Sequence, residues 1–155
     1  MSFPLPQPMR LALDLAADAA LRGEVPVGAV IMRGDEIVAA VGNAMRAGSD
    51  ATAHAEIEAI RAACARLASQ QLDDCDLYVT LEPCAMCAGA ISHARLRRLY
   101  YGADDPKGGA VAHGPLFFAQ PTCHHRPEIY AGIGEAEAGA LLRDFFRERR
   151  CEEEG

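Results

Sequence analysis

The chain has 155 residues, of which 50% are hydrophobic, and a formal net charge of −7 at pH 7. This length and composition predict one globular domain over residues 1–155, with a core over about residues 9–150 and a short acidic tail over residues 151–155. No apolar segment approaches the roughly 18 residues that suggest a membrane span, and the acidic balance disfavours a general nucleic-acid-binding protein.

The first residues carry prolines at positions 4, 6 and 8 and no positive charge ahead of an apolar run, so they do not read as a secretory signal. We therefore expect a cytoplasmic protein with no membrane partner. Residues 9–22 follow as an amphipathic helix, in which Leu11 and Leu15 share the face toward the core. Gly23 marks the end of this helix.

Two β-branched apolar runs, residues 25–32 and 37–41, are separated by a short polar turn and predict a β-hairpin. Asn43 follows the second run, directly after a glycine, where the residue type alone indicates a turn. A polar loop then leads into a second helix, which is expected to begin near Thr52 and to continue to Leu67.

A buried strand over residues 77–81 delivers Glu82-Pro83-Cys84 to the start of a third helix, with Pro83 expected at the first helical position. Another strand is expected over residues 96–102, followed by a loop-rich section and a final helix over residues 135–150. This alternation of strands and helices predicts a three-layer α/β/α domain with a mixed sheet.

Residues of metal-ligating type gather at the starts of the second and third helices. Cys84 and Cys87 are three positions apart, so they share one face of a helix near its N-terminus, where the helix dipole favours thiolates. His54 lies at the start of the other helix, and one imidazole with two thiolates is a good set of zinc ligands. Because three protein ligands leave one position open for water, as in catalytic zinc sites, we predict one catalytic Zn²⁺ per subunit.

Glu56 follows the predicted histidine ligand by two residues. A helix-capping role fits poorly, because a capping box that started at Thr52 would place its acid at position 55, which is Ala55. A carboxylate near the first helical turn could instead reach a water in the open metal position and act as general base and then general acid. We therefore predict that Glu56 is the catalytic residue.

The other cysteines and histidines do not form a second pattern. The four of the six cysteines outside the predicted ligand pair are scattered along the chain, without the spacing of a disulfide framework. A second metal site among His113, His124 and His125 is disfavoured, because no nearby cysteine or well-spaced acid completes a ligand set.

The basic residues are unevenly distributed, since nine of the 15 Lys and Arg lie from Arg95 onward. Such a cluster is often only a solvated face, but it is also compatible with recognition of one folded RNA. In the final helix, Ala136 and the adjacent Phe145 and Phe146 are expected to face the protein, and the arginines to be exposed. One of the two phenylalanines could instead offer a stacking surface to unpaired bases.

The motif His54-x-Glu56 followed by Pro83-Cys84-x-x-Cys87 is the signature of zinc-dependent nucleobase deaminases. With further matching segments at residues 24–30, 77–89 and 144–147, the chain resembles the bacterial tRNA-specific adenosine deaminases over about residues 9–150. That resemblance implies a cytidine deaminase-like α/β fold with a central mixed five-stranded sheet. It further implies hydrolytic deamination of adenosine to inosine at the wobble position of a tRNA anticodon stem-loop, release of ammonia, and a homodimer.

The same resemblance assigns substrate contacts to a further set of residues. They come from the first hairpin, the start of the second helix, the loop-rich section and the final helix: Val27, Asn43, Ala55, Asp105, Lys107, His125, Arg126 and Phe146. The chain departs from the usual pattern of these enzymes at Asp104, His113 and His124, where other residue types are common. These departures leave the zinc residues unchanged and bear on how the RNA on either side of the target base is held.

Two other functions are weighed against this one. A free nucleobase or nucleoside deaminase of the same fold, acting on guanine or cytosine, would carry the same zinc residues, although the arginine-rich final helix favours RNA. A non-catalytic, zinc-stabilised partner subunit is disfavoured, because such a subunit has no need of the proton shuttle that Glu56 provides.

Overall fold

A computed structural model describes residues 4–154. Residues 1–3, which belong to the N-terminal segment expected not to be a signal, and Gly155 of the acidic tail lie outside the described residues. No helix within residues 4–154 is long and apolar enough to cross a membrane.

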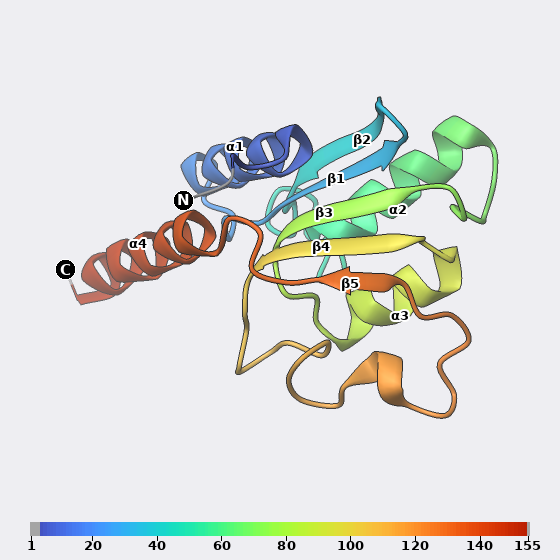
Figure 1. Cartoon of the computed structure of the whole chain (residues 1–155). Coiled ribbons are helices and arrows are strands. Elements are labelled where there is room, and N and C mark those ends of the chain that lie inside the picture. The colour runs from blue at the N-terminus through green and yellow to red at the C-terminus, as the bar shows by residue number, and fades with distance from the viewer. Residues whose placement is uncertain (1–3, 155) are drawn as a thin grey trace.

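The chain is organised around one mixed sheet of five strands in the order β2-β1-β3-β4-β5 (Figure 1). The strands are β1 (Gly28–Arg33), β2 (Glu36–Gly42), β3 (Asp76–Leu81), β4 (Arg98–Ala103) and β5 (Glu128–Tyr130). β1 pairs antiparallel with both β2 and β3, whereas β3, β4 and β5 run parallel. The predicted hairpin and the mixed five-stranded sheet are therefore confirmed.

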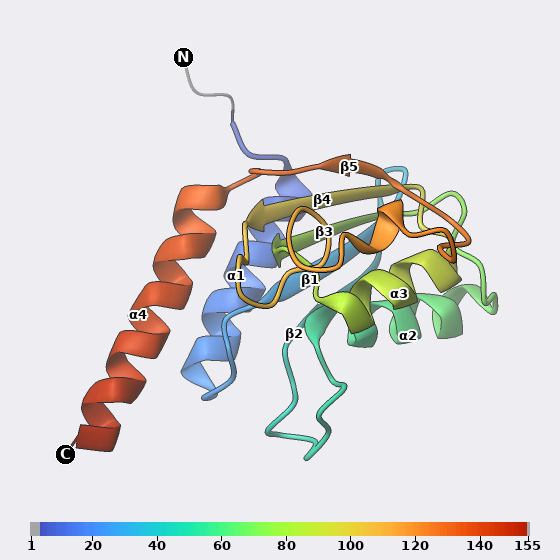
Figure 2. The same cartoon turned by 90° about the horizontal axis from the view of Figure 1, so that it is seen from below.

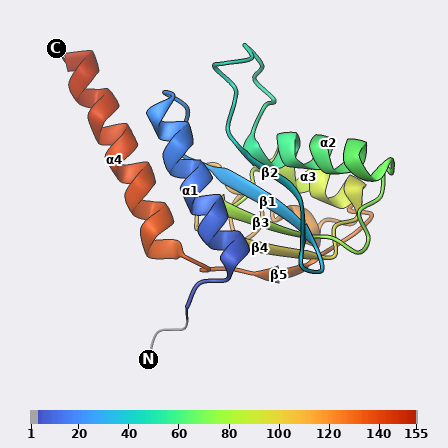
Figure 3. The same cartoon turned by 90° about the horizontal axis from the view of Figure 1, so that it is seen from above.

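Helices cover both faces of the sheet, as Figures 1 and 3 show. α1 (Gln7–Leu21) and α4 (Glu135–Glu154) lie on one face, and α2 (Ala55–Leu67) and α3 (Ala85–Ala94) lie on the other. Successive residues of a strand point to opposite faces, so Val30 packs in the core under α1 while its neighbour Ile31 packs in the core under α2 and α3. The predicted three-layer α/β/α architecture is confirmed.

The predicted core face of α1, which Leu11 and Leu15 share with Ala12 and Ala19, does pack on the sheet, but its alanines are buried more deeply than its leucines. Leu11 and Leu15 are only half-buried, and the fully buried positions include Met9, Ala12 and Leu13. The reason is a close approach to the sheet: a Cβ atom on Gly28 of β1 would lie 2.0 Å from the carbonyl oxygen of Ala12. The side of the helix that carries alanines therefore faces the strand.

Both helices of the predicted metal site begin later than expected, α2 at Ala55 and α3 at Ala85. His54 is the N-cap of α2 and Cys84 is the N-cap of α3, so Pro83 precedes the cap and is not at the first helical position. The backbone of Cys84 is still extended, with φ −74° and ψ 178°, because the chain leaves β3 in an extended conformation. Each helix thus presents its free N–H groups just beyond a predicted metal ligand.

The final helix is longer than expected and turns a different set of residues inward. α4 continues through the acidic tail to Glu154. Phe145 is 7% exposed, but Phe146 is 45% exposed, so only the first of the two adjacent phenylalanines belongs to the core. Ala136 is exposed and Ala138 is buried in its place, and Arg149 is not free in solvent but lies over the Phe145 ring at 5.3 Å.

Candidate active site

The three predicted metal ligands come together at the N-termini of α2 and α3, which lie side by side on the same face of the sheet (Figure 2). The Nδ1 atom of His54 lies 3.8 Å from the Sγ atom of Cys84 and 3.6 Å from the Sγ atom of Cys87. Residues 30 positions apart therefore present one nitrogen and two sulfurs to a single point.

The spacing of these donors fits a metal ion. In a tetrahedral site with zinc–sulfur bonds of about 2.3 Å and zinc–nitrogen bonds of about 2.0 Å, a nitrogen and a sulfur ligand are about 3.5 Å apart. The two observed nitrogen–sulfur distances, 3.6 Å and 3.8 Å, are close to this value. An imidazole with two thiols also has the ligand chemistry of a zinc site and leaves a fourth position for another ligand.

The electrostatics of the cysteine pair favour the deprotonated form of Cys84. A hydrogen bond from the Cys87 thiol, assisted by His54, lowers the pKa of Cys84 to about 4. The same sulfur–sulfur hydrogen bond, together with burial, raises the pKa of Cys87. The interaction with Cys84 raises the pKa of His54 in turn. A metal ion would replace the proton that these groups share, since thiolates are the form that binds metal.

Glu56 is the second residue of α2, and its side chain turns into the site. It is 4% exposed, and its carboxylate interacts with the thiol of Cys87. Burial is the main cause that raises the pKa of Glu56 above its ordinary value. A buried carboxyl beside the metal donors, with an elevated pKa, is suited to accept and return protons near neutral pH.

Asn43 joins two segments of the site wall. Its Oδ1 atom accepts a hydrogen bond of 2.7 Å from the backbone N–H of Ala55, and its Nδ2 atom donates one of 3.2 Å to the carbonyl oxygen of Val25. Val27 and Ala55 are themselves buried in the core. In this structure the three residues Asn43, Val27 and Ala55 fix the start of α2 against the 25–27 segment, and substrate contact by any of them stays a prediction.

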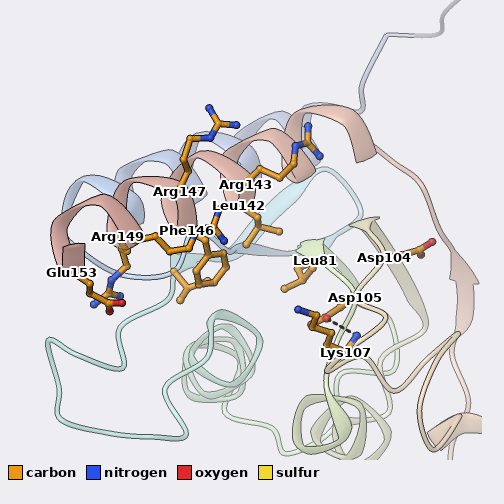
Figure 4. Close-up of a pocket in the computed structure, with 12 residues that line it drawn as sticks. Leu81, Asp104, Asp105, Lys107, Leu142, Arg143, Phe146, Arg147, Arg149 and Glu153 are labelled. Atoms are coloured by element: carbon orange, nitrogen blue, oxygen red, sulfur yellow. Dashed lines mark hydrogen bonds between the residues drawn. The ribbon is translucent and has the colours of Figure 1, made fainter. Parts of the chain in front are cut away.

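Three other predicted substrate residues line an open groove of about 900 Å³ beside the site (Figure 4). Phe146 lies on its α4 wall, and Asp105 and Lys107 lie on the opposite wall. Val25 and Leu81, the last residue of β3, also line the groove and connect it to the segments that carry the metal donors. The remaining lining residues are mostly charged: Asp104, Leu142, Arg143, Arg147, Arg149, Arg150 and Glu153.

His125 contacts the other end of α3 from the metal donors. The Nε2 atom of His125 donates to the carbonyl oxygen of Leu96 at 2.7 Å, and its backbone N–H donates to Ser92 Oγ at 3.1 Å. Ser92 and Leu96 lie at the C-terminal end of α3, and a helix of ten residues is about 15 Å long. Within this chain His125 holds its loop against the far end of α3, and substrate contact by His125 or Arg126 stays a prediction.

Two buried glutamates were not predicted to have a role. Glu24 accepts backbone hydrogen bonds from Arg46 and Ala47, at 3.2 Å and 2.9 Å. Glu82 accepts four hydrogen bonds, and these outweigh the effect of burial and hold its pKa below the ordinary value. The signal in the sequence was an acidic residue directly beside a buried apolar run, as in Leu81-Glu82-Pro83.

Fold and site together define a deaminase, and the family model described as MafB19-like deaminase matches residues 6–150. A protein named tRNA-specific adenosine deaminase from Agrobacterium fabrum is 57% identical over 145 residues, which cover 94% of this chain and 95% of that protein. One from Bacillus subtilis is 40% identical over 142 residues, covering 92% of this chain and 88% of that protein. The chain belongs to the family of tRNA-specific adenosine deaminases.

A solved structure from work on A-to-I editing by tRNA:A34 deaminases at the wobble position of transfer RNA has the same fold. It superposes with a TM-score of 0.87 at 56% identity and covers 88% of this chain and 99% of that one. The structure of guanine deaminase from Bacillus subtilis is also similar, with a TM-score of 0.62 and 43% identity over 63% of each chain. The fold is therefore shared with enzymes that act on a free base.

Proposed function

We propose that this protein deaminates adenosine to inosine at the wobble position, A34, of a tRNA anticodon loop, by hydrolysis that releases ammonia. The observation that carries the proposal is the position of Glu56 against a His54, Cys84 and Cys87 cluster, next to a groove walled by arginines. Proteins named for this activity, similar over nearly the whole chain, support it.

His54, Cys84 and Cys87 would hold one Zn²⁺ per subunit, because their donor atoms have the chemistry and spacing that zinc prefers. When bound, the ion would supply Lewis acidity that makes water a nucleophile near neutral pH. The donors lie at two helix N-termini, so the positive ends of both helices favour the negative charge of the thiolates.

Glu56 would carry the protons of the reaction. It accepts a proton from the attacking water and passes it to N1 of the adenine, then takes the remaining proton from the hydroxyl now on C6 and delivers it to the departing amino group. A bond forms between oxygen and C6, the bond between C6 and nitrogen breaks, and inosine and ammonia leave. Burial of Glu56 keeps bulk water away from this exchange and keeps its proton affinity suited to both steps.

The groove would hold the RNA around the target base. C6 of an adenine is inaccessible within a stack, so the nucleotide must be extruded toward the metal donors, as in other base-modifying enzymes. Arg143, Arg147 and Arg150 are exposed on the groove side of α4 and are suited to phosphates, while the exposed ring of Phe146 offers a stacking surface. We expect the local basic wall to outweigh the net negative charge of the chain at this surface.

The family resemblance further leads us to propose a homodimer that acts in the cytoplasm, where its tRNA substrate is found. We also propose that the whole chain works as one domain. Helices from the first and last parts of the chain, α1 and α4, share one core on the same sheet face, which supports that organisation.

Deamination of free guanine or cytosine is the second candidate, favoured by the similarity to guanine deaminase of Bacillus subtilis. A non-catalytic subunit is the third, and the buried Glu56 beside the metal donors speaks against it. The test is to incubate the purified zinc protein with an anticodon stem-loop bearing adenosine at the wobble position, and separately with free adenosine, guanine and cytosine. Inosine and ammonia are measured in each reaction.

Inosine from the stem-loop alone is the expected result. The variant Glu56→Ala should keep its zinc and lose roughly 100-fold or more in rate, because the proton shuttle is removed. Ammonia from a free base alone would keep the chemistry and reject the RNA substrate. Unchanged turnover by Glu56→Ala would reject the mechanism.

A further inference from the structure

The loop over residues 104–113 is wrapped around the carboxylate of Glu82. Oε1 of Glu82 accepts a hydrogen bond from the backbone N–H of Asp105 at 3.0 Å, and Oε2 accepts from the backbone N–H groups of Val111 and Ala112 at 3.1 Å and 3.0 Å. The side chain of Glu82 is fully buried, so one carboxylate holds both ends of this loop.

The backbone of the loop packs closely against the Glu82 side chain at Gly109. A Cβ atom on Gly109 would lie 2.4 Å from Oε2 of Glu82 and 2.6 Å from the carbonyl oxygen of Asp105. The backbone N–H of Ala110 donates to the carbonyl oxygen of Pro83 at 2.9 Å. The 104–113 loop is thereby tied to the segment that leads directly into Cys84 and α3.

His113 adds a side-chain contact to this arrangement. Its Nδ1 atom lies 2.7 Å from Oε1 of Glu82, and its side chain is 32% exposed at the end of the loop. Asp104, at the other end, brings its carboxylate within 4.8 Å of the same two side chains. His113 and Asp104, from the two ends of the loop, therefore both lie beside Glu82.

The expectation that no acid lies near His113 to complete a ligand set is wrong, because Glu82 and Asp104 lie beside it. The hydrogen bonds nevertheless favour a role other than cation binding. Glu82 already accepts three backbone N–H groups and the His113 ring, so its oxygens are satisfied. A metal ion would have to displace at least one of these donors. The arrangement is that of a clamp on the loop.

The loop carries two residues of the groove wall. Oδ1 of Asp105 accepts from the backbone N–H groups of Gly108 at 2.9 Å and Lys107 at 3.3 Å, so the turn that directs the Lys107 side chain is set by Asp105. Asp105 is in turn fixed by Glu82. Figure 4 shows Asp105 and Lys107 on the groove wall that faces the α4 side chains.

We propose that Glu82 and His113 are positioning residues, which clamp the 104–113 loop so that Asp105 and Lys107 are held in place to contact RNA in the groove. The part of this proposal that concerns RNA rests on the proposed function. Glu82 anchors the loop through its backbone N–H groups, and His113 adds a side-chain hydrogen bond to the same carboxylate.

The test uses the zinc-loaded full-length protein and the variant His113→Ala. His93→Ala is the matched control, because His93 is an exposed histidine on α3 that does not line the groove and makes no hydrogen bond to Glu82. His113→Asn is the conservative variant, since its amide N–H₂ can donate to the same carboxylate. Glu82→Gln is a stronger variant that tests the anchor itself.

Hydrogen exchange at the backbone amides of Asp105, Val111 and Ala112 should be about tenfold faster in His113→Ala, the size expected for loss of one hydrogen bond to a charged group. KM for the stem-loop should rise by about the same factor while kcat and zinc content stay near the wild-type values, and His113→Asn should restore both readouts. His93→Ala should behave as wild type. Glu82→Gln, if it folds, should show larger effects of the same kind.

Unchanged exchange and unchanged KM in His113→Ala would overturn the proposal. So would a second divalent ion bound by the wild-type chain and lost in His113→Ala, because the cluster would then be a metal site. The exchange measurement needs no substrate, so it tests the clamp even if the protein deaminates something other than tRNA. Absence of inosine from the wild-type reaction would reject the proposed function alone.

Discussion

Replacement of the two adjacent phenylalanines of α4 by alanine should affect different properties, stability at Phe145 and RNA affinity at Phe146. Phe145 is 7% exposed and packs beneath the Arg149 guanidinium, so Phe145→Ala should lower the free energy of unfolding by about 3 kcal/mol. Phe146 is 45% exposed in the groove, so Phe146→Ala should cost about 1 kcal/mol or less in stability. If its ring stacks on a base, RNA binding should weaken by roughly 1–3 kcal/mol, which is about 5- to 150-fold in Kd.

Stability would be measured by urea denaturation followed by circular dichroism. Affinity would be measured by fluorescence anisotropy of a labelled anticodon stem-loop at one fixed salt concentration, because phosphate contacts make Kd depend strongly on salt. Phe146→Tyr keeps the aromatic ring and serves as the control, with affinity near that of the wild type. Equal destabilisation by the two alanine variants, with RNA affinity unchanged in Phe146→Ala, would refute the assignment of Phe146 to the groove.

The metal donors, a close backbone contact, the half-buried Tyr78 and the buried Tyr101 lead to three further predictions. Removal of metal by a chelator should abolish deamination and lower the melting temperature, and added Zn²⁺ should restore both. Cys84→Ser should lose activity that added Zn²⁺ does not restore. Recovery of activity by that variant would argue against Cys84 as a ligand. Gly28→Ala should lower the free energy of unfolding by about 3 kcal/mol, because the added Cβ would lie 2.0 Å from a backbone oxygen of α1. Gly48→Ala is the control: its Cβ would have no contact closer than 3.5 Å, so the urea midpoint should change little. Burial raises the pKa of Tyr78 and of Tyr101 to about 12, above the value near 10 of an unfolded chain. Their neutral forms therefore stabilise the fold below pH 10, and this contribution is lost as the pH rises through 12. Absorbance at 295 nm should show this late ionisation, and full titration of both tyrosines near pH 10 in the folded protein would contradict the prediction.

Much of the fold follows from local patterns in the sequence. The hairpin of β1 and β2, the buried strand β3 and the four helices each have a continuous signal of apolar periodicity or β-branched residues, and these elements were predicted close to their observed positions. β5 has no such signal. It contains only Glu128–Tyr130 and forms because Arg98 to Tyr100 of β4 offer it a partner, which is information from a distant part of the chain.

The metal-binding residues of the site were easier to predict from the sequence than the residues that hold its loops in place. The positions of His54, Cys84 and Cys87 follow from ligand type and from the spacing of two cysteines on one helix, and the structure brings all three together. The role of Glu82 could not be predicted in this way. Three of its four partners are backbone N–H groups 23 to 30 positions away, and any residue type except proline can supply a backbone N–H. Side chains that organise loops through backbone donors leave almost no pattern in the sequence.

The course of α4 has a practical consequence for handling the protein. The helix carries the arginines of the groove and continues to Glu154, with Glu153 still on the groove wall. A purification tag or fusion partner joined after this helix would start at the mouth of the groove and compete with RNA for the same space. The first turn of α1 lies at the opposite end of the α1 and α4 pair (Figure 2), so an N-terminal tag is the better choice for binding and activity assays.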